Sequence, residues 1–136
     1  MIFVRIIAVI LISISLSACF PNIQSDGSKK AESLYKKGVL VEGFPTLPYY
    51  EKSKIVESFA FEKKYGASYV SNDELLKVVE FYNASLKGLG WDFTQKKISD
   101  TNYVFEVKNK DHQGVVIVNR AADGKKTAIT YSVEAR

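Results

Sequence analysis

Apolar and polar residues alternate along much of the second half of the chain, which is the pattern of half-buried β-strands. The first such stretch covers residues 55–62, with Ile55, Phe59 and Phe61 on one side and Glu57 interrupting the alternation. Val115 to Val118 is apolar at every position, as is typical of a strand in the middle of a sheet. Further strands are predicted near 91–93, 103–108 and 127–133, with turns at 99–102 and at Asp123-Gly124.

Residues 75–89 follow a different period, with apolar residues three or four positions apart, and this predicts one long amphipathic helix. Ser71-Asn72-Asp73-Glu74 has the spacing of a capping box at its start. Gly88 and Gly90 are suited to the left-handed conformation that often ends a helix. The predicted buried stripe consists of Leu75, Val79, Tyr82, Leu86 and Leu89, widened by Leu76 and Val78.

These elements predict an α+β fold. We expect an antiparallel sheet of about four to five strands with one long helix packed on one face, in the order strand, helix, strand meander. Residues 31–37 are compatible with a turn of helix, and residues 67–70 with a short strand or with the approach to the helix.

The amino terminus has the three parts of a secretory signal peptide: a positive charge at Arg5, an apolar run from Ile6 to Leu16, and small residues after it. The run closes on Leu16-Ser17-Ala18-Cys19, which resembles the lipobox of bacterial lipoprotein precursors at all four positions. The resemblance implies a diacylglycerol on the Cys19 sulfur and cleavage after Ala18. An uncleaved membrane anchor, or a buried free cysteine beside an ordinary cleavage site, are the alternatives.

The residue after the lipid-bearing cysteine bears on which membrane holds the protein. Phe20 is not the Asp that retains enterobacterial lipoproteins in the inner membrane, so the resemblance points to the outer membrane, facing the periplasm. A Gram-positive surface lipoprotein remains an alternative. We expect three regions: a signal peptide at 1–18; a lipid anchor, flexible tether and lead-in segment at 19–50; and a small α+β domain at 51–136.

Composition narrows the chemistry of the domain. Cys19 is the only cysteine in 136 residues, so once it is acylated no disulfide and no cysteine-based metal site is available. From Glu51 onward there are 14 Lys or Arg and 12 Asp or Glu, which leaves an interspersed net charge of +2. Such a surface does not predict nucleic-acid binding. Lys29, Lys30, Lys36 and Lys37 form one basic cluster near the anchor, suited either to anionic lipid or simply to solubility.

A second resemblance covers about Ile55 to Val133. Ser-Tyr-Val-Ser at 68–71, Phe81-Tyr82 with Leu86, and Gly90-Trp91 are similar to a pattern in small bacterial envelope lipoproteins of unknown function. The resemblance implies a helix-grip or BamC-like fold and carries no chemistry.

Candidate chemistry is sparse. His112 is the only histidine, beside Asp111 in a polar loop, and no Gly-x-Ser-x-Gly motif accompanies it. We therefore predict no catalytic residue, no cofactor and no metal site, although a hydrolase using His112 is a third hypothesis. Several tyrosines either line a groove for a glycan or peptide or fill the core: Tyr49, Tyr50, Tyr65, Tyr69 and Tyr103.

The sequence thus favours a membrane-tethered envelope lipoprotein that is not an enzyme and acts as a protein-binding or assembly module, with an envelope protein as its expected partner. The alternatives are a module that binds cell-wall glycan or lipid, and a periplasmic inhibitor or immunity lipoprotein. An exposed sheet edge or apolar patch would favour the first hypothesis, and a concave pocket with exposed Tyr or Trp91 the second.

Overall fold

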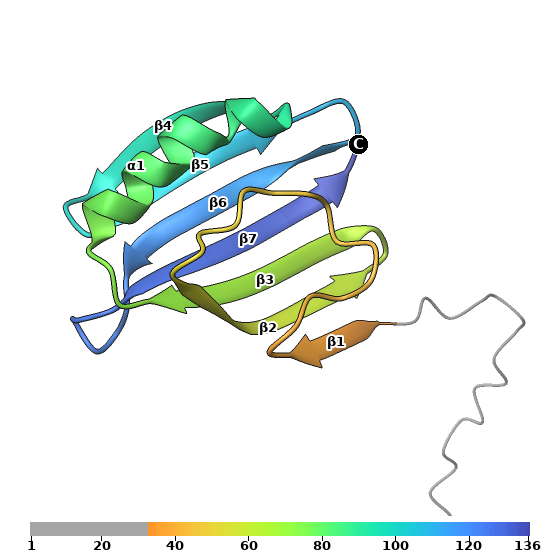
Figure 1. The fold of residues 1–136 in the computed structure, drawn as a ribbon. Coiled ribbons are helices and arrows are strands. Elements are labelled where there is room, and N and C mark those ends of the chain that lie inside the picture. The colour runs from red at the N-terminus through yellow and green to blue at the C-terminus, as the bar shows by residue number, and fades with distance from the viewer. Residues whose placement is uncertain (1–32) are drawn as a thin grey trace, which may run out of the picture.

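The computed structural model of the protein describes residues 33–136. Seven strands and one helix make up this part of the chain (Figure 1). The strands are β1 (Leu34–Lys37), β2 (Ser53–Phe61), β3 (Lys64–Ser71), β4 (Asp92–Ser99), β5 (Asn102–Lys108), β6 (His112–Arg120) and β7 (Thr127–Ala135). The helix α1 (Leu75–Ser85) lies between β3 and β4 and is followed by a 3₁₀ turn, Lys87–Leu89.

All seven strands form one antiparallel sheet in the order β1-β2-β3-β7-β6-β5-β4. The chain leaves the sheet after β3, crosses through α1 to the far edge, and returns by β4, β5 and β6 until β7 closes against β3. The last strand in the sequence is therefore the central strand of the sheet, with three strands on either side.

The predicted α+β fold class is wrong, both in the number of strands and in the length of the helix. The sheet has seven strands rather than four or five, and the helix is short, with 11 residues in α1 and three in the following turn. The described chain is thus mostly antiparallel β-sheet. The missed strand β1 and most of β4 are exposed on both sides, so they have no apolar alternation that could reveal them in the sequence.

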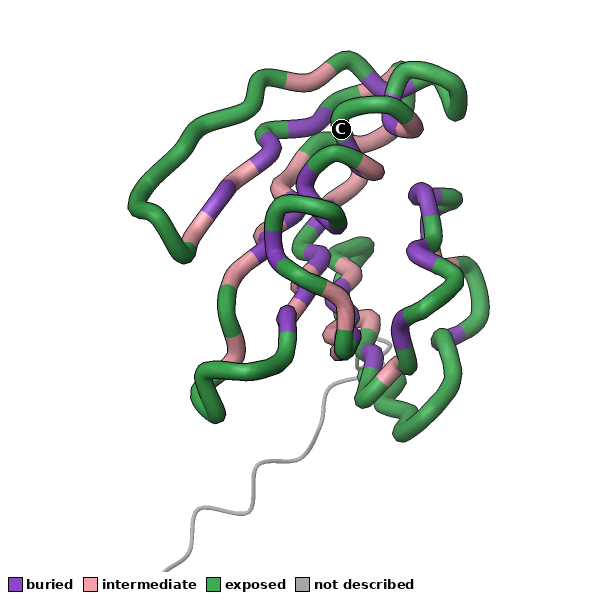
Figure 2. Tube along the Cα trace, turned by 60° about the vertical axis from the view of Figure 1, so that its left-hand side comes forward, coloured by how far each residue is buried: buried purple, intermediate pink, exposed green. Residues whose placement is uncertain are grey.

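One face of the sheet is covered by α1 and by residues 38–52, which we call the covering segment (Figure 1). Buried positions alternate with exposed or half-buried ones along β3, β5, β6 and β7 (Figure 2). The buried side chains point to the covered face and form a single core with those of α1 and the covering segment. We call the opposite side of the sheet the outer face; no described residue covers it.

The covering segment is tied to β2 by Ser58, whose side chain is wholly buried. The Ser58 hydroxyl donates to the carbonyl of Val39 and accepts from the backbone N–H of Val41, both at 2.8 Å. A single hydroxyl thereby satisfies two backbone groups of a segment that has no regular structure of its own.

Two core aromatic residues hold the middle of the covering segment. The Trp91 indole N–H donates to the carbonyl of Thr46 at 2.9 Å, and the Tyr131 hydroxyl donates to that of Pro48 at 2.6 Å. Tyr82 on α1 lies 2.6 Å from the Tyr131 hydroxyl, so helix, sheet and covering segment meet in one buried chain of hydrogen bonds. Burial raises the pKa of both phenols above the ordinary value.

The helix differs from its prediction at both ends. No side chain caps its start: Ser71 accepts from the N–H of Asp73 and donates to the carbonyl of Lys52, so the predicted capping box is wrong. The residue that ends the 3₁₀ turn, Gly90, has the predicted left-handed conformation, with φ of +82°. Leu89, predicted as part of the buried stripe, is exposed because the helix has already ended.

The alternation predicted for residues 55–62 does not hold along β2, because Ile55 packs against the core while Phe59 and Phe61 do not. A β-bulge between Ile55 and Glu57 shifts the alternation by one residue, so that Ser58 points to the core. Phe59 and Phe61 consequently lie on the outer face, where they are 47% and 43% exposed.

Candidate functional surface

The predicted lipid attachment site lies outside the described residues. Leu16, Ser17, Ala18 and Cys19 precede residue 33, and lipidation at Cys19 stays a prediction. Within residues 33–136, no helix is both long enough and apolar enough to cross a bilayer.

The five tyrosines proposed for a groove do not share one site, although the ring centroids of Tyr49 and Tyr69 lie 5.8 Å apart. Tyr69 is buried in the core against Tyr131, and Tyr103 is buried at the far side of the sheet. Tyr49 and Tyr69 line a hollow of about 240 Å³ beside the covering segment, and Tyr50 lines a neighbouring one of about 220 Å³. Both are smaller than typical sites for small molecules, which have volumes of at least about 300 Å³.

Trp91 and His112, the other candidate residues, are also not arranged for ligand binding or catalysis. The indole of Trp91 is only 1% exposed, so it is not available to stack on a ligand. His112 begins β6, with its ring 6.2 Å from that of Tyr65 and 6.4 Å from that of Trp91. Among residues 33–136, its side chain has no hydrogen bond to a serine or carboxylate, and no cluster of acidic, His and Cys side chains is suited to a metal ion.

A larger hollow, of about 580 Å³, lies beside the start of α1 and the β6–β7 turn. It presents charges of both signs, and its Lys97 is paired with Asp100 at 2.7 Å. Its charged residues are Glu74, Lys97, Asp100, Arg120, Lys125 and Lys126. This mixed charge pattern gives no preference for one class of ligand.

The outer face of the sheet has an unusual distribution of charge. Its three central strands present small and β-branched residues there, and charged side chains appear only at one end, as Lys64 and Glu134. The uncharged outward positions are Gly66, Ser68 and Val70 on β3; Ala128, Thr130 and Ser132 on β7; and Val115, Ile117 and Asn119 on β6. Solvent-facing sides of antiparallel sheets are normally polar, so this face resembles the centre of a packing surface.

Exposed aromatic residues adjoin this uncharged centre on β1 and β2, and we call Tyr35, Phe59 and Phe61 the aromatic patch. Tyr35 is opposite Phe59 in the strand register and is 55% exposed. The Phe59 ring covers Gly66 on β3, where a side chain would leave no room for it. The Tyr35 hydroxyl donates to Glu57 at 2.7 Å, and this hydrogen bond raises the pKa of Tyr35.

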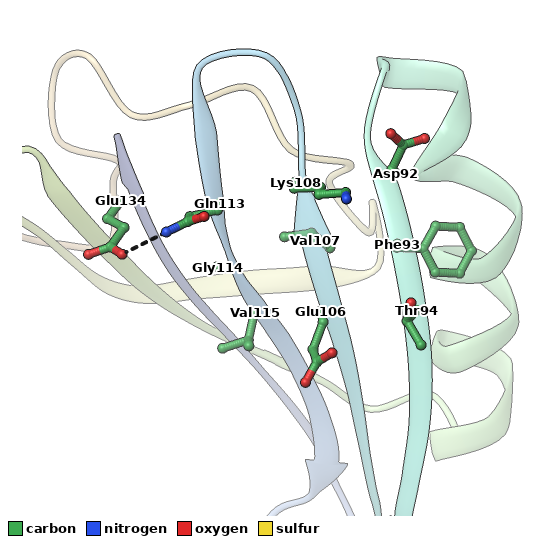
Figure 3. Close-up of a pocket in the computed structure, with 10 residues that line it drawn as sticks. All are labelled: Asp92, Phe93, Thr94, Glu106, Val107, Lys108, Gln113, Gly114, Val115 and Glu134. Carbon is green, nitrogen blue, oxygen red and sulfur yellow. Dashed lines mark hydrogen bonds between the residues drawn. The ribbon is translucent and has the colours of Figure 1, made fainter. Parts of the chain in front are cut away.

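A shallow hollow of about 460 Å³ lies at the other side of the same face, across β4, β5 and β6 (Figure 3). Its rim carries carboxylates from Asp92, Glu106 and Glu134, and its floor includes Val115. The amide of Gln113 donates to Glu134 at 3.2 Å. Phe93, although it adjoins the hollow, points towards α1 and packs against the core (Figure 3). We call this site the outer hollow.

The sequence pattern does not reveal this surface, because the predicted alternation groups Phe59 and Phe61 with Ile55, which packs against the core. A signal was nevertheless present: Ala128, Thr130 and Ser132 are small and uncharged at the positions that face away from the core in the last strand. Such residues are unremarkable one by one. Only the strand order places them beside the uncharged positions of two other strands.

Comparison of the chain with protein-family models, with curated proteins and with solved structures finds no match.

Proposed function

We propose that the protein is a lipid-anchored module of the bacterial envelope that is not an enzyme and that binds another protein chain through the outer face. The observation that carries the proposal is the uncharged centre of this face, flanked by exposed aromatic rings. Protein interfaces are depleted of charge at their centre and enriched in aromatic residues, with polar residues at the rim. The outer face has this arrangement.

The size of the face also supports a protein as partner. The longer strands have eight or nine residues, which at ~3.3 Å per residue makes them about 28 Å long. Six gaps of ~4.8 Å give the sheet a width of about 29 Å. The product is on the order of 800 Å², somewhat more than the sheet itself covers because β1 has only four residues, and it is comparable to the area that each partner contributes to a standard interface.

Site-specific photocrosslinking in intact cells tests the binding surface. A photoreactive amino acid at Ile117 or Thr130, in the middle of the outer face, should form adducts with a protein chain. The same group at Asn83, on the exposed side of α1, should not. If the two outer positions give no more adduct than Asn83, the outer face is not a protein-binding surface.

The anchor needs a separate experiment. We expect the native protein to lose residues 1–18, to gain acyl mass and to sediment with membranes, while Cys19→Ser remains soluble. Two or more acyl chains hold a protein stably on a membrane, at about 0.8 kcal/mol per buried methylene. Intact-mass analysis of both forms measures cleavage and acylation, and membrane fractionation measures attachment. An unmodified Cys19 in the native protein would contradict lipidation.

A further inference from the structure

We propose that the protein chain bound by the outer face is a second copy of the same chain, packed face to face about a two-fold axis that runs along β7. This inference rests on the proposed function, because it names the partner of that surface. Three features of the described residues carry it: the symmetry of the strand order, the match between the aromatic patch and the outer hollow, and the area of the face.

The strand order is balanced around β7, with three strands on each side. Consider a two-fold axis that is parallel to β7 and lies midway between two stacked sheets. It places each strand of one copy over the strand of the second copy that is equally distant from β7 on the opposite side. β3 then lies over β6 of the second copy, β2 over β5, and β1 over β4. The interface is isologous, as it is in most homodimers, and all seven strands take part.

The same axis preserves position along the strands, so the register shows which side chains meet. Phe59, Gly66, Ser132, Val115 and Glu106 share one row across the sheet. In the dimer, Phe59 of one copy therefore lies over Glu106 of the other, beside Val115. Phe61 shares the next row with Lys108 and lies over it.

These rows are the ones that contain the outer hollow. The residues of the hollow that face outward all belong to the rows of Phe59 and Phe61, namely Asp92, Thr94, Glu106, Lys108, Gln113, Val115 and Glu134. Each copy thus offers the protruding rings of Phe59 and Phe61 and the outer hollow of about 460 Å³. The two-fold axis places the rings of each copy over the hollow of the other, so the contact occurs twice. The Lys108 ammonium below Phe61 can make a cation–π contact.

The uncharged centre is what makes close stacking of the two sheets favourable. Ser68 lies over Ile117, and Thr130 lies over its own counterpart at the axis, so in this row the dimer covers no charged side chain of β3, β7 or β6. Glu134 of each copy meets its equivalent at one end of the axis, where Lys64 is its cross-strand neighbour. These charges are at the edge of the interface and stay accessible to water.

Both copies together bury on the order of 1,600 Å², the standard size of a stable interface. A two-fold face-to-face arrangement also shelters the exposed rings of both aromatic patches at once. Exposed aromatic groups of this kind are otherwise a liability for aggregation.

Charged substitutions at Phe59 and Glu106, which face each other in the proposed dimer, test the proposal. They are made in the full chain carrying Cys19→Ser, so that no lipid is attached. Phe59→Glu would remove the buried ring and place a carboxylate against Glu106 of the second copy, which is itself paired with Lys96 at 2.6 Å. We expect the dissociation constant of the dimer to rise at least about 30-fold, mainly through loss of the ring. Adding Glu106→Lys to the same chain should restore dimerisation, because opposite charges then face each other at both contacts. Sedimentation equilibrium across a range of concentrations measures each variant, and urea unfolding checks that each one is folded.

A second measurement does not depend on these substitutions. Without Cys19 the chain has no thiol, so Thr130→Cys introduces a single one beside the axis. A short bismaleimide should link two copies in high yield, because the two thiols face each other between sheets that are stacked ~10 Å apart. The matched control, Asn83→Cys on α1, should remain monomeric in the same reaction.

A chain that stays monomeric at all concentrations, or an equal yield of linked dimer from Thr130→Cys and Asn83→Cys, would overturn the face-to-face dimer. The proposed function is tested separately. If photocrosslinks from Ile117 and Thr130 then join a different protein, the outer face still binds a protein partner and only its identity as a second copy is wrong. If those positions give no adducts either, both proposals fail.

Discussion

Ser58 shows at the scale of single residues how a small polar side chain can organise a large segment. It lies in a strand between exposed neighbours, yet its hydroxyl is wholly buried and bridges Val39 and Val41. The sequence alone indicates the reverse arrangement, because Phe59 is much more hydrophobic than Ser58. The bulge between Ile55 and Glu57 determines which side chain points inward, and no apolar or polar pattern in the sequence marks its position.

Ser58→Ala should therefore destabilise the protein out of proportion to its size. The Val41 N–H, on a buried residue, loses its acceptor, and an unsatisfied buried polar group costs about 1–3 kcal/mol. Urea unfolding measures the loss. Ser68→Ala on the outer face is the matched control and should change the free energy of unfolding by less than about 0.5 kcal/mol. Equal losses for the two variants would show that Ser58 does not hold the covering segment.

Two glycines in the sheet should differ in their response to a methyl group. A Cβ at Gly114 would lie 2.1 Å from the carbonyl oxygen of Ser132, which belongs to the backbone of β7 and cannot move freely. A Cβ at Gly66 would meet the ring of Phe59 at 2.2 Å, but this ring is half exposed and can rotate away. We expect Gly114→Ala to cost several times more stability than Gly66→Ala in thermal unfolding. The reverse order would contradict the backbone contact at Gly114.

The elements differ in how far they could be predicted. Strands with a buried and an exposed side, such as β5 and β7, are where their alternation places them. The helix is present where the apolar period predicts it, but it begins at Leu75, three residues after the start that a cap at Ser71 implies. β1 was missed because Leu34-Tyr35-Lys36-Lys37 is exposed throughout and is held by pairing with β2 rather than by burial. Such pairing is a tertiary property that local sequence does not contain.

The contact between the covering segment and the approach to α1 should make stability depend on pH in the alkaline range. The Tyr50 hydroxyl donates to the Asp73 carboxylate, and burial, aided by this bond, raises the pKa of Tyr50 to about 12. The folded pKa lies above the ordinary value of 10.0, so the stabilisation is complete below pH 10 and is lost as pH rises towards 12. The free energy of unfolding should fall across this range.

Two variants separate the causes of this pH dependence. Tyr50→Phe should lower stability at neutral pH and reduce the alkaline fall, leaving the part due to Tyr69, Tyr82 and Tyr131, whose pKa values burial also raises. Asp73→Asn removes the charge beside Tyr50, together with the ion pair to Lys77, and should retain most of the fall, since burial is the larger cause of the raised Tyr50 pKa. Urea unfolding at a series of pH values gives the slopes. An unchanged slope in Tyr50→Phe would exclude this contact as a contributor.

At the scale of the whole molecule, the arrangement of the strands was the part that the sequence could not reveal. Alternation in residues 127–133 correctly predicts a strand with one solvent-facing side, but it does not say that this strand pairs with β3, more than 50 residues earlier, as well as with β6. The candidate surface depends on that pairing. Its uncharged positions are spread over three strands and become one surface only when β7 joins the two halves of the sheet.

The central place of β7 predicts that the described fold cannot form without the last ten residues. A chain ending at Lys126 lacks Ile129, Tyr131 and Val133 from the core, each worth about 1.5–3 kcal/mol of buried apolar surface. It also leaves the edges of β3 and β6 unpaired, and together these losses are comparable to the whole stability of a small domain. We expect no cooperative unfolding transition in this truncated chain, followed by circular dichroism. Adding a peptide of residues 127–136 should restore the transition, because the peptide supplies both pairing edges and the Tyr131 hydroxyl. A truncated chain that still unfolds cooperatively would show that the two halves of the sheet are stable without the strand that joins them.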